Sequence, residues 1–236
     1  MHSKLELNET SVIEGELLLI DKPLNWTSFQ VVNKIRWELK NKFGIKKLKV
    51  GHAGTLDPLA TGLLLVCTGK MTKKISEIQA LVKEYTGTFT LGATTPSYDL
   101  ETPIDGTFPI DHLDDNALKE VINQFTGVVD QYPPVFSAIK KDGKRLYEYA
   151  RKGEEIKINS RQIEILVFEL TKIKLPTIDF YVKCSKGTYI RSLANDYGKA
   201  LGSGAHLSSL RRTAIGLHRI EDAYTIEQIT VELEVI

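Results

Sequence analysis

A loop punctuated by three glycines, GHAGTLDPLATG at residues 51–62, constrains this chain more than any other feature. It runs directly into the apolar segment 63–67, which is typical of a buried strand. Pro58 disfavours helical backbone at Asp57, so we expect this acid on extended or turn backbone at the edge of that strand. Glycines permit tight turns and the close approach of a ligand. The loop can therefore present Asp57 as a nucleophile, and the alternative is a turn in which the acid only caps backbone groups.

The whole loop resembles the signature of the TruB family of tRNA pseudouridine synthases. The family pattern, Gly-His-x-Gly-Thr-Leu-Asp-Pro-x-Ala-x-Gly-x-Leu, is matched from Gly51 to Leu64. The resemblance spans roughly residues 15–229, and further segments agree in the family's order: DKP at 21–23, KEY at 83–85, YPPVFSA at 132–138, GTYIR at 187–191 and LRRT at 210–213. It implies a pseudouridine synthase fold of the α+β class, with a mixed, largely antiparallel sheet, flanking helices and an RNA-binding cleft. It also implies an isomerase that converts uridine to pseudouridine in the T loop of tRNA, at position 55.

The composition is that of an ordinary soluble globular protein, with 236 residues of which 42% are hydrophobic and 26% charged. No apolar run approaches the length of a membrane span, and the N-terminus lacks the apolar core of a signal peptide. Cys67 and Cys184 both lie in strand-like apolar patterns, which favours buried, reduced thiols. We therefore expect a cytoplasmic protein with no membrane association.

Positive charge is local, because the formal net charge is only +1. The basic clusters flank the special motifs, and they lie at 46–49, 70–74, 140–145 and 211–212. Such clusters most often form a solvated surface, but their placement here favours a rim that contacts RNA phosphates.

Hydrophobic periodicity and turn signals predict mixed helices and strands without regular βαβ alternation. Thr27 and Gln30 form a potential capping box for a helix that runs to about Phe43. We expect further helices at about 72–81, 114–125, 145–152, 188–201 and 225–229, and strands at 17–20, 63–67, 83–93, 127–131, 163–174, 178–185 and 207–215. Residues 94–109 are expected to form a loop, and Asp142-Gly143 a turn.

The chain contains no convincing linker, so we predict one catalytic domain over residues 1–236. Many relatives continue into a C-terminal RNA-binding domain of the PUA type, and we expect none here. Recognition of tRNA should then depend on its T arm. We expect a monomer, because no apolar helix face is left over.

Arg191 gives an independent physical clue. It lies in the first turn of the helix predicted from Thr188, beside the apolar face of that helix. A cation at this position opposes the helix macrodipole, and an anionic partner would compensate it. Asp57 is the expected partner, as the resemblance also implies, and the pair would keep the carboxylate ionised and oriented. The alternative is an exposed arginine that reaches solvent.

The resemblance assigns roles to further residues. Asp57, Tyr85 and Arg191 are the expected catalytic residues, and Tyr85 would stack on the uracil and assist removal of the proton from carbon 5. The expected substrate-binding residues are His52, which would enter the RNA loop, Tyr189 and Leu210, which would line the uracil pocket, and Lys22, which would support the catalytic loop. By pattern alone these are a structural histidine, core or sheet side chains and a surface lysine.

We expect no cofactor and no metal. The five histidines are scattered, and neither a phosphate-binding loop nor a dinucleotide motif is present. The isomerisation neither oxidises nor hydrolyses its substrate. One departure from the family pattern is Asn25, where glycine is usual, and asparagine tolerates left-handed backbone. The alternatives to the synthase are an RNA chaperone, whose chemistry is secondary or lost, and an unrelated hydrolase with an aspartate nucleophile.

Overall fold

The computed structural model describes residues 7–235, except 138, 142, 151 and 155. The chain divides into two compact units. The first comprises Met1–Tyr85 with Leu210–Ile236, and the second comprises Thr86–Ser209. Strands β4 (Lys83–Leu91) and β12 (Ala205–Ile215) each contribute residues to both units. The expectation of one catalytic domain stays a prediction.

In the first unit, the buried strand β3 (Ala60–Thr68) organises the sheet. Strand β1 (Leu17–Lys22) pairs with it antiparallel, and β12 pairs with it parallel, with Leu210 opposite Ala60. The short strands β2 (Val50–His52) and β13 (His218–Arg219) add antiparallel pairs to β3 and β12. The predicted strand that follows the Asp57 loop is therefore confirmed, and β3 begins three residues after Asp57.

Helix α2 (Ser28–Phe43) begins and ends as its sequence predicts. The Thr27 hydroxyl accepts a hydrogen bond from the backbone of Gln30, whose side chain accepts one from the Thr27 backbone. The helix ends at Gly44, whose φ of 66° is left-handed. The other helical segments of this unit are α1 (Glu9–Glu14), η1 (Gly69–Lys74), α3 (Ile75–Ala80), η3 (Ile220–Asp222) and α7 (Ile226–Val235). The final helix is longer than the predicted 225–229.

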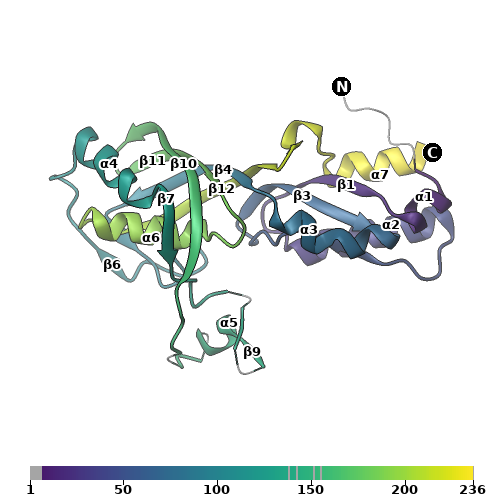
Figure 1. The fold of residues 1–236 in the computed structure, drawn as a ribbon, viewed down its shortest axis with the longest axis horizontal. Coiled ribbons are helices and arrows are strands. Elements are labelled where there is room, and N and C mark those ends of the chain that lie inside the picture. The colour runs from purple at the N-terminus through teal and green to yellow at the C-terminus, as the bar shows by residue number, and fades with distance from the viewer. Residues whose placement is uncertain (1–6, 138, 142, 151, 155, 236) are drawn as a thin grey trace. The chain divides into compact units, whose positions relative to one another are not determined.

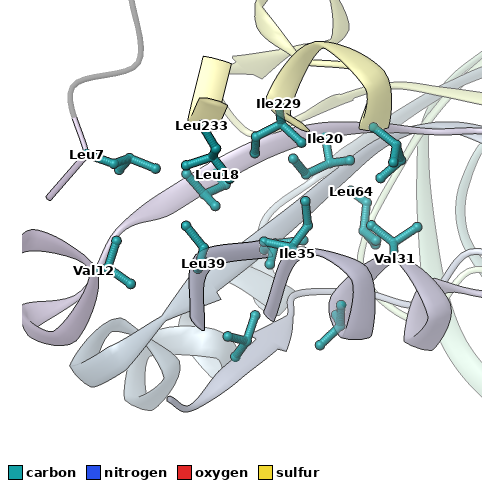
Figure 2. Close-up of a cluster of buried hydrophobic side chains, with 14 of the residues drawn as sticks. Leu7, Val12, Leu18, Ile20, Val31, Ile35, Leu39, Leu64, Ile229 and Leu233 are labelled. Atoms are coloured by element: carbon teal, nitrogen blue, oxygen red, sulfur yellow. The ribbon is translucent and has the colours of Figure 1, made fainter. Parts of the chain in front are cut away.

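The core of the first unit joins two helices to the sheet. Val31, Ile35 and Leu39 recur on one face of α2 and are fully or almost fully buried. Figure 2 shows this face opposite Leu18, Ile20 and Leu64 of the sheet, and Ile229 and Leu233 from α7 on the same core. The four-residue spacing of these apolar residues therefore places them on the buried face of α2.

The second unit also combines a sheet with helices (Figure 1). Its strands follow the order β12, β4, β11 (Thr177–Cys184), β10 (Arg161–Lys174) and β7 (Gly127–Gln131). The hairpin of β10 with β11 and the pair of β10 with β7 are antiparallel. The strands predicted at 163–174 and 178–185 are therefore confirmed. Smaller elements are β5 (Ala93–Thr94), β6 (Gly106–Thr107), β8 (Lys140–Lys141), β9 (Lys144–Arg145) and α5 (Leu146–Ala150). Asp142 of the predicted turn lies outside the described residues.

Two helices cover this unit's core. Asp114 caps α4 (Asp115–Ile122), which continues into η2 (Asn123–Phe125). Helix α6 (Ile190–Ala200) places the ring of Tyr197 beside Phe89 and Phe168, with centroid distances of 6.1 and 5.6 Å. The Tyr197 hydroxyl donates to the carbonyl of Leu118 at 2.6 Å, which satisfies the polar end of a buried ring.

These elements confirm the predicted α+β class and its mostly antiparallel sheet. Both cysteines are buried and free, as predicted. Among the residues that the structure describes, no helix is long and apolar enough to cross a membrane.

Candidate active site

The Asp57 loop lies between β2 and β3 and is held by backbone hydrogen bonds. Asp57 is half-buried, and its carbonyl accepts the amide of Ala60 at 3.1 Å. The next carbonyl, that of Pro58, accepts the amide of Asn25 at 2.9 Å. Asn25 adopts a left-handed φ of 64°, a conformation that asparagine tolerates, at this departure from the family pattern. The left-handed backbone at Asn25 directs its N–H at the Asp57 loop.

Lys22 supports the same loop from inside the protein. It is 0% exposed, and its ammonium donates to the carbonyls of Trp26 at 2.6 Å, Pro23 at 2.9 Å and Pro58 at 3.4 Å. Burial lowers the pKa of Lys22 to about 8, while the negative charge of Asp57 opposes that fall. The interpretation of Lys22 as a surface residue is therefore wrong, and the supporting position expected from the resemblance agrees with these contacts.

Helix α2 is fastened to the other side of the loop. The hydroxyl of Ser28, its first residue, accepts the amide of Leu56 at 2.9 Å and donates to the Leu56 carbonyl at 3.0 Å. Both groups are buried, so this reciprocal pair is shielded from competing water. The backbone N–H and the backbone carbonyl of Leu56, directly before Asp57, are thus both hydrogen-bonded to Ser28.

Arg212 and Arg211, which we grouped as one basic cluster, lie in different environments. Arg212 is 1% exposed and donates to the carbonyls of Leu63 at 2.7 Å and Gly54 at 3.0 Å. Arg211 is partly exposed and binds both carboxylate oxygens of Asp21, at 2.7 and 3.1 Å. The prediction that Arg212 belongs to a phosphate-contacting rim is wrong, because loop and strand carbonyls use its donors in the interior.

His52 lies at the end of β2, and Arg212 affects its charge. Burial lowers the pKa of His52, the positive charge of Arg212 lowers it further, and a hydrogen bond with the backbone of Gly54 opposes the change. The neutral ring therefore predominates at pH 7. A neutral imidazole is less costly to bury than a charged one, because no charge has to be taken out of water.

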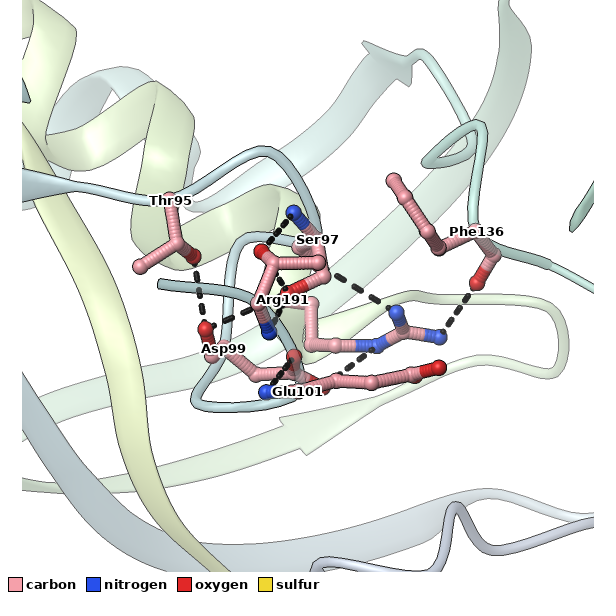
Figure 3. Close-up of polar contacts among 7 residues, drawn as sticks. Thr95, Ser97, Asp99, Glu101, Phe136 and Arg191 are labelled. Atoms are coloured by element: carbon pink, nitrogen blue, oxygen red, sulfur yellow. Dashed lines mark hydrogen bonds and ion pairs between the residues drawn. The ribbon is translucent and has the colours of Figure 1, made fainter. Parts of the chain in front are cut away.

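In the second unit, Arg191 is a buried cation whose guanidinium is surrounded by polar groups of Ser97, Asp99 and Phe136 (Figure 3). It is 4% exposed, and its guanidinium donates to the carbonyls of Phe136 at 3.0 Å and Ser97 at 3.2 Å. Asp99 forms an ion pair with it at 3.6 Å. The alternative of a solvent-exposed arginine is wrong, and the need for an anionic partner is met within this unit by Asp99.

The backbone of Tyr189 is clamped by one side chain. The Gln131 amide accepts the Tyr189 N–H at 2.7 Å and donates to the Tyr189 carbonyl at 3.0 Å. The guanidinium of Arg161 lies over the Tyr189 ring at 4.7 Å and also donates to the carbonyl of Gly187. The peptide and the ring of Tyr189 are thus both positioned before α6 begins.

The predicted site residues fall into two groups. Lys22, His52, Asp57, Tyr85 and Leu210 belong to the first unit, and Tyr189 and Arg191 to the second. Within the first unit, Leu210 pairs with Ala60 beside the loop, and Tyr85 is buried in β4. The predicted ion pair of Asp57 with Arg191 joins residues of different units and stays a prediction.

Sequence reasoning missed several supporting residues. Asp99 lies in the stretch interpreted as a loop, where nothing marks one acid among several. Gln131 and Ser28 act through backbone groups distant in sequence, which no local pattern reveals. For Arg212, the only signal was its place in the LRRT segment. Within the described part of the chain, no group of three or more His, Cys, Asp or Glu residues could hold a metal ion.

Comparisons with known proteins agree with this geometry. The profile of the TruB family pseudouridylate synthase N-terminal domain matches residues 40–190, and that of the tRNA pseudouridylate synthase B C-terminal domain matches residues 191–235. The tRNA pseudouridine synthase B of Flavobacterium johnsoniae is 65% identical over 91% of this chain and 94% of its own. That of Phocaeicola vulgatus is 56% identical over 91% of each chain.

Solved structures also resemble this chain. A chain in the crystal structure of a Cbf5-Nop10-Gar1 complex matches 94% of this one with a TM-score of 0.69 and 28% identity. A chain in a structure of an H/ACA RNP bound to a substrate RNA containing 2'-deoxyuridine matches 93% of it with a TM-score of 0.66 and 26% identity. This chain spans about half the length of those solved chains, 55% and 53%.

The sheet is mixed, and the Asp57 loop is held at the start of a buried strand. Together with these matches, this architecture defines a pseudouridine synthase. More particularly, the chain belongs to the TruB family of pseudouridylate synthases.

Proposed function

We propose that this protein isomerises uridine to pseudouridine at position 55 in the T loop of tRNA, with Asp57 as the catalytic nucleophile or base. The observation that carries the proposal is the complete loop 51–64, held by Lys22, Asn25 and Ser28 so that Asp57 is half-buried at the head of β3. The names of the relatives, tRNA pseudouridine synthase B, support tRNA as the substrate.

The reaction begins with removal of the target uridine from its stack, which costs a few kcal/mol. Stacking on Tyr85, together with contacts to phosphates, offsets that cost. Asp57 then acts at the sugar or the base, by attack at C1′, by attack at C6, or by proton abstraction that gives a glycal. The bond between N1 of the uracil and C1′ of the sugar breaks, the uracil turns, and a new bond forms between its carbon 5 and C1′. The proton of carbon 5 is then lost and N1 gains one, so the product is an isomer of the substrate.

The remaining site residues prepare this step. Arg191 would pair with Asp57 and keep its carboxylate ionised and aimed. Tyr189, clamped by Gln131, and Leu210 would line the uracil pocket, and neutral His52 would occupy the space that the uridine leaves. No step requires a cofactor. We further propose a monomer with a single catalytic domain that binds the T arm in the cytoplasm, where tRNA is processed.

The test is tritium release from a T-arm hairpin labelled at carbon 5 of uridine. We expect release by the wild type, none by Asp57→Asn, and unchanged hairpin binding by that variant, because amide and carboxylate have the same shape. Asp222→Asn removes an exposed acid from the same unit and serves as the control. Tritium release by Asp57→Asn at a rate close to that of the wild type would refute the assignment of Asp57.

A further inference from the structure

The outer face of α2 carries exposed aromatic residues. Its inner face is occupied by Val31, Ile35 and Leu39, whereas Phe29 is 62% exposed and Trp37 is 57% exposed. The two rings are eight residues apart and lie within about 80° of one another around the helix, at about 12 Å along its axis. Both rings therefore lie on the solvent-exposed side of α2, away from its buried face.

The same region carries a concentrated positive charge. Residues 33–49 have a formal charge of +6, although the whole chain has +1. Lys46, Lys47 and Lys49 are exposed in the segment that follows α2. Glu38 is the one acid in residues 33–49, and its largely buried carboxylate binds Lys34 at 2.6 Å and accepts from Thr230 at 3.3 Å. The charges that this region presents to solvent are therefore mainly those of lysines.

Trp37 is an exposed aromatic ring with a positive charge beside it. The ammonium of Lys34 lies 5.1 Å from the centre of its ring. Aromatic rings beside positive side chains bind nucleic acid by stacking on bases while lysines neutralise phosphates. An anionic polymer that also presents planar rings matches both properties, whereas an acidic peptide or a lipid headgroup matches only the charge.

The surface is connected to the catalytic loop at both of its ends. Ser28, at the start of α2, binds both backbone polar atoms of Leu56, next to Asp57. Beyond Lys49 the chain enters β2, which ends at His52. Since α2 has 16 residues, its axis is about 24 Å long. Its far end therefore lies well outside a pocket for one nucleotide.

We propose that the α2 surface, formed by Lys34, Trp37, Lys40, Lys46, Lys47 and Lys49, is a second RNA-contact site. It binds phosphates and stacks on a base of the same tRNA whose target uridine reaches Asp57, at nucleotides outside the uracil pocket. This inference rests on the proposed function for the identity of the RNA. These residues then contribute to the affinity for tRNA and take no part in the chemical step.

Tryptophan fluorescence tests the stacking part, because the chain has two tryptophans, Trp26 and Trp37. We expect unmodified tRNA to quench the emission of Trp26→Phe, in which Trp37 remains, and to have little effect on Trp37→Phe. Circular dichroism of both variants checks that they are folded. Equal quenching in both variants, or quenching of Trp37 by polyglutamate or phosphatidylserine vesicles but not by tRNA, would overturn the proposal.

Salt dependence tests the phosphate part. We compare the triple variant Lys46→Gln, Lys47→Gln, Lys49→Gln with a charge-matched control, Lys119→Gln, Lys172→Gln, Lys174→Gln, whose lysines are exposed in the second unit. The first should weaken tRNA binding about tenfold near 0.15 M salt and reduce the slope of log Kd against log salt by about 2. Single-turnover formation of pseudouridine at saturating tRNA should match the wild type.

The two proposals fail in different ways. If the two triple variants show the same Kd and slope, the α2 surface does not bind RNA, even when pseudouridine is formed normally. If the wild type forms no pseudouridine, the proposed function fails, and a weaker affinity specific to the α2 variant would still support an RNA-contact site.

Discussion

Replacing Lys22 with Met should change how the stability of this protein depends on pH. The Lys22 ammonium is fully buried, and its pKa falls from 10.5 to about 8 because burial disfavours the charged form. Between these two values the unfolded chain binds more protons than the folded protein. Wild-type stability should therefore rise with pH in this window, and Lys22→Met should lack that contribution.

The magnitude follows from the two pKa values. Each unit of difference corresponds to about 1.4 kcal/mol, so the full effect is about 3 kcal/mol. This contribution to stability is fully present above about pH 10.5 and is lost as the pH falls from 10.5 to about 8. Between about pH 7.5 and about pH 9.5 the contribution of Lys22 to the free energy of unfolding should increase by about 2 kcal/mol.

Urea denaturation of both proteins at these two pH values measures the effect. Other groups also titrate there, for example Cys67, whose pKa burial raises to about 11. The difference between wild type and Lys22→Met cancels their contributions, provided that the two sites are independent. If this difference is the same at both pH values, the Lys22 ammonium has an ordinary pKa and the reasoning is refuted.

Two further predictions concern stability. Asp99→Asn should lower the free energy of unfolding by about 3 kcal/mol in urea, because it neutralises the carboxylate of a buried ion pair with Arg191; a loss below about 0.5 kcal/mol would show that this pair is not important. Gly62→Ala should cost about 3 kcal/mol or more, since φ is +103° and the new Cβ would lie 2.7 Å from the backbone nitrogen of Arg212. Gly44→Ala, where no atom lies within 4 Å of the new Cβ, should cost only about 1 kcal/mol, and equal losses would contradict this explanation.

Structural features that depend on residues close together in the sequence could be predicted. The capping box of Thr27 and Gln30 started α2 where expected, because its hydrogen bonds join residues only three positions apart. Asn25 adopted left-handed backbone because its side chain tolerates that conformation. The end of α7 was not predictable in this way, since packing of Ile229 and Leu233 against the core, not a local signal, extends the helix to Val235.

The candidate site was only partly predictable for the same reason. The loop 51–64 identified Asp57, and the helix macrodipole argument predicted that Arg191 needs an anionic partner. Within its unit the partner of Arg191 is Asp99, and the two residues are 92 positions apart in the chain. No periodicity marks such a pair, because its energy comes from joint burial and not from local conformation.

The sequence by itself determined the loop that presents Asp57, the strand that follows it and the amphipathic helix α2, because each depends on local backbone preference and on hydrophobic spacing. Only the tertiary structure decided which cations are interior. Arg211 and Arg212 are adjacent and chemically identical, yet Arg211 reaches Asp21 at the surface and Arg212 is buried. The difference arises because carbonyls of residues 54 and 63, about 150 positions earlier in the chain, satisfy the guanidinium of Arg212. A buried charge is stable only with such partners, and folding alone brings them together.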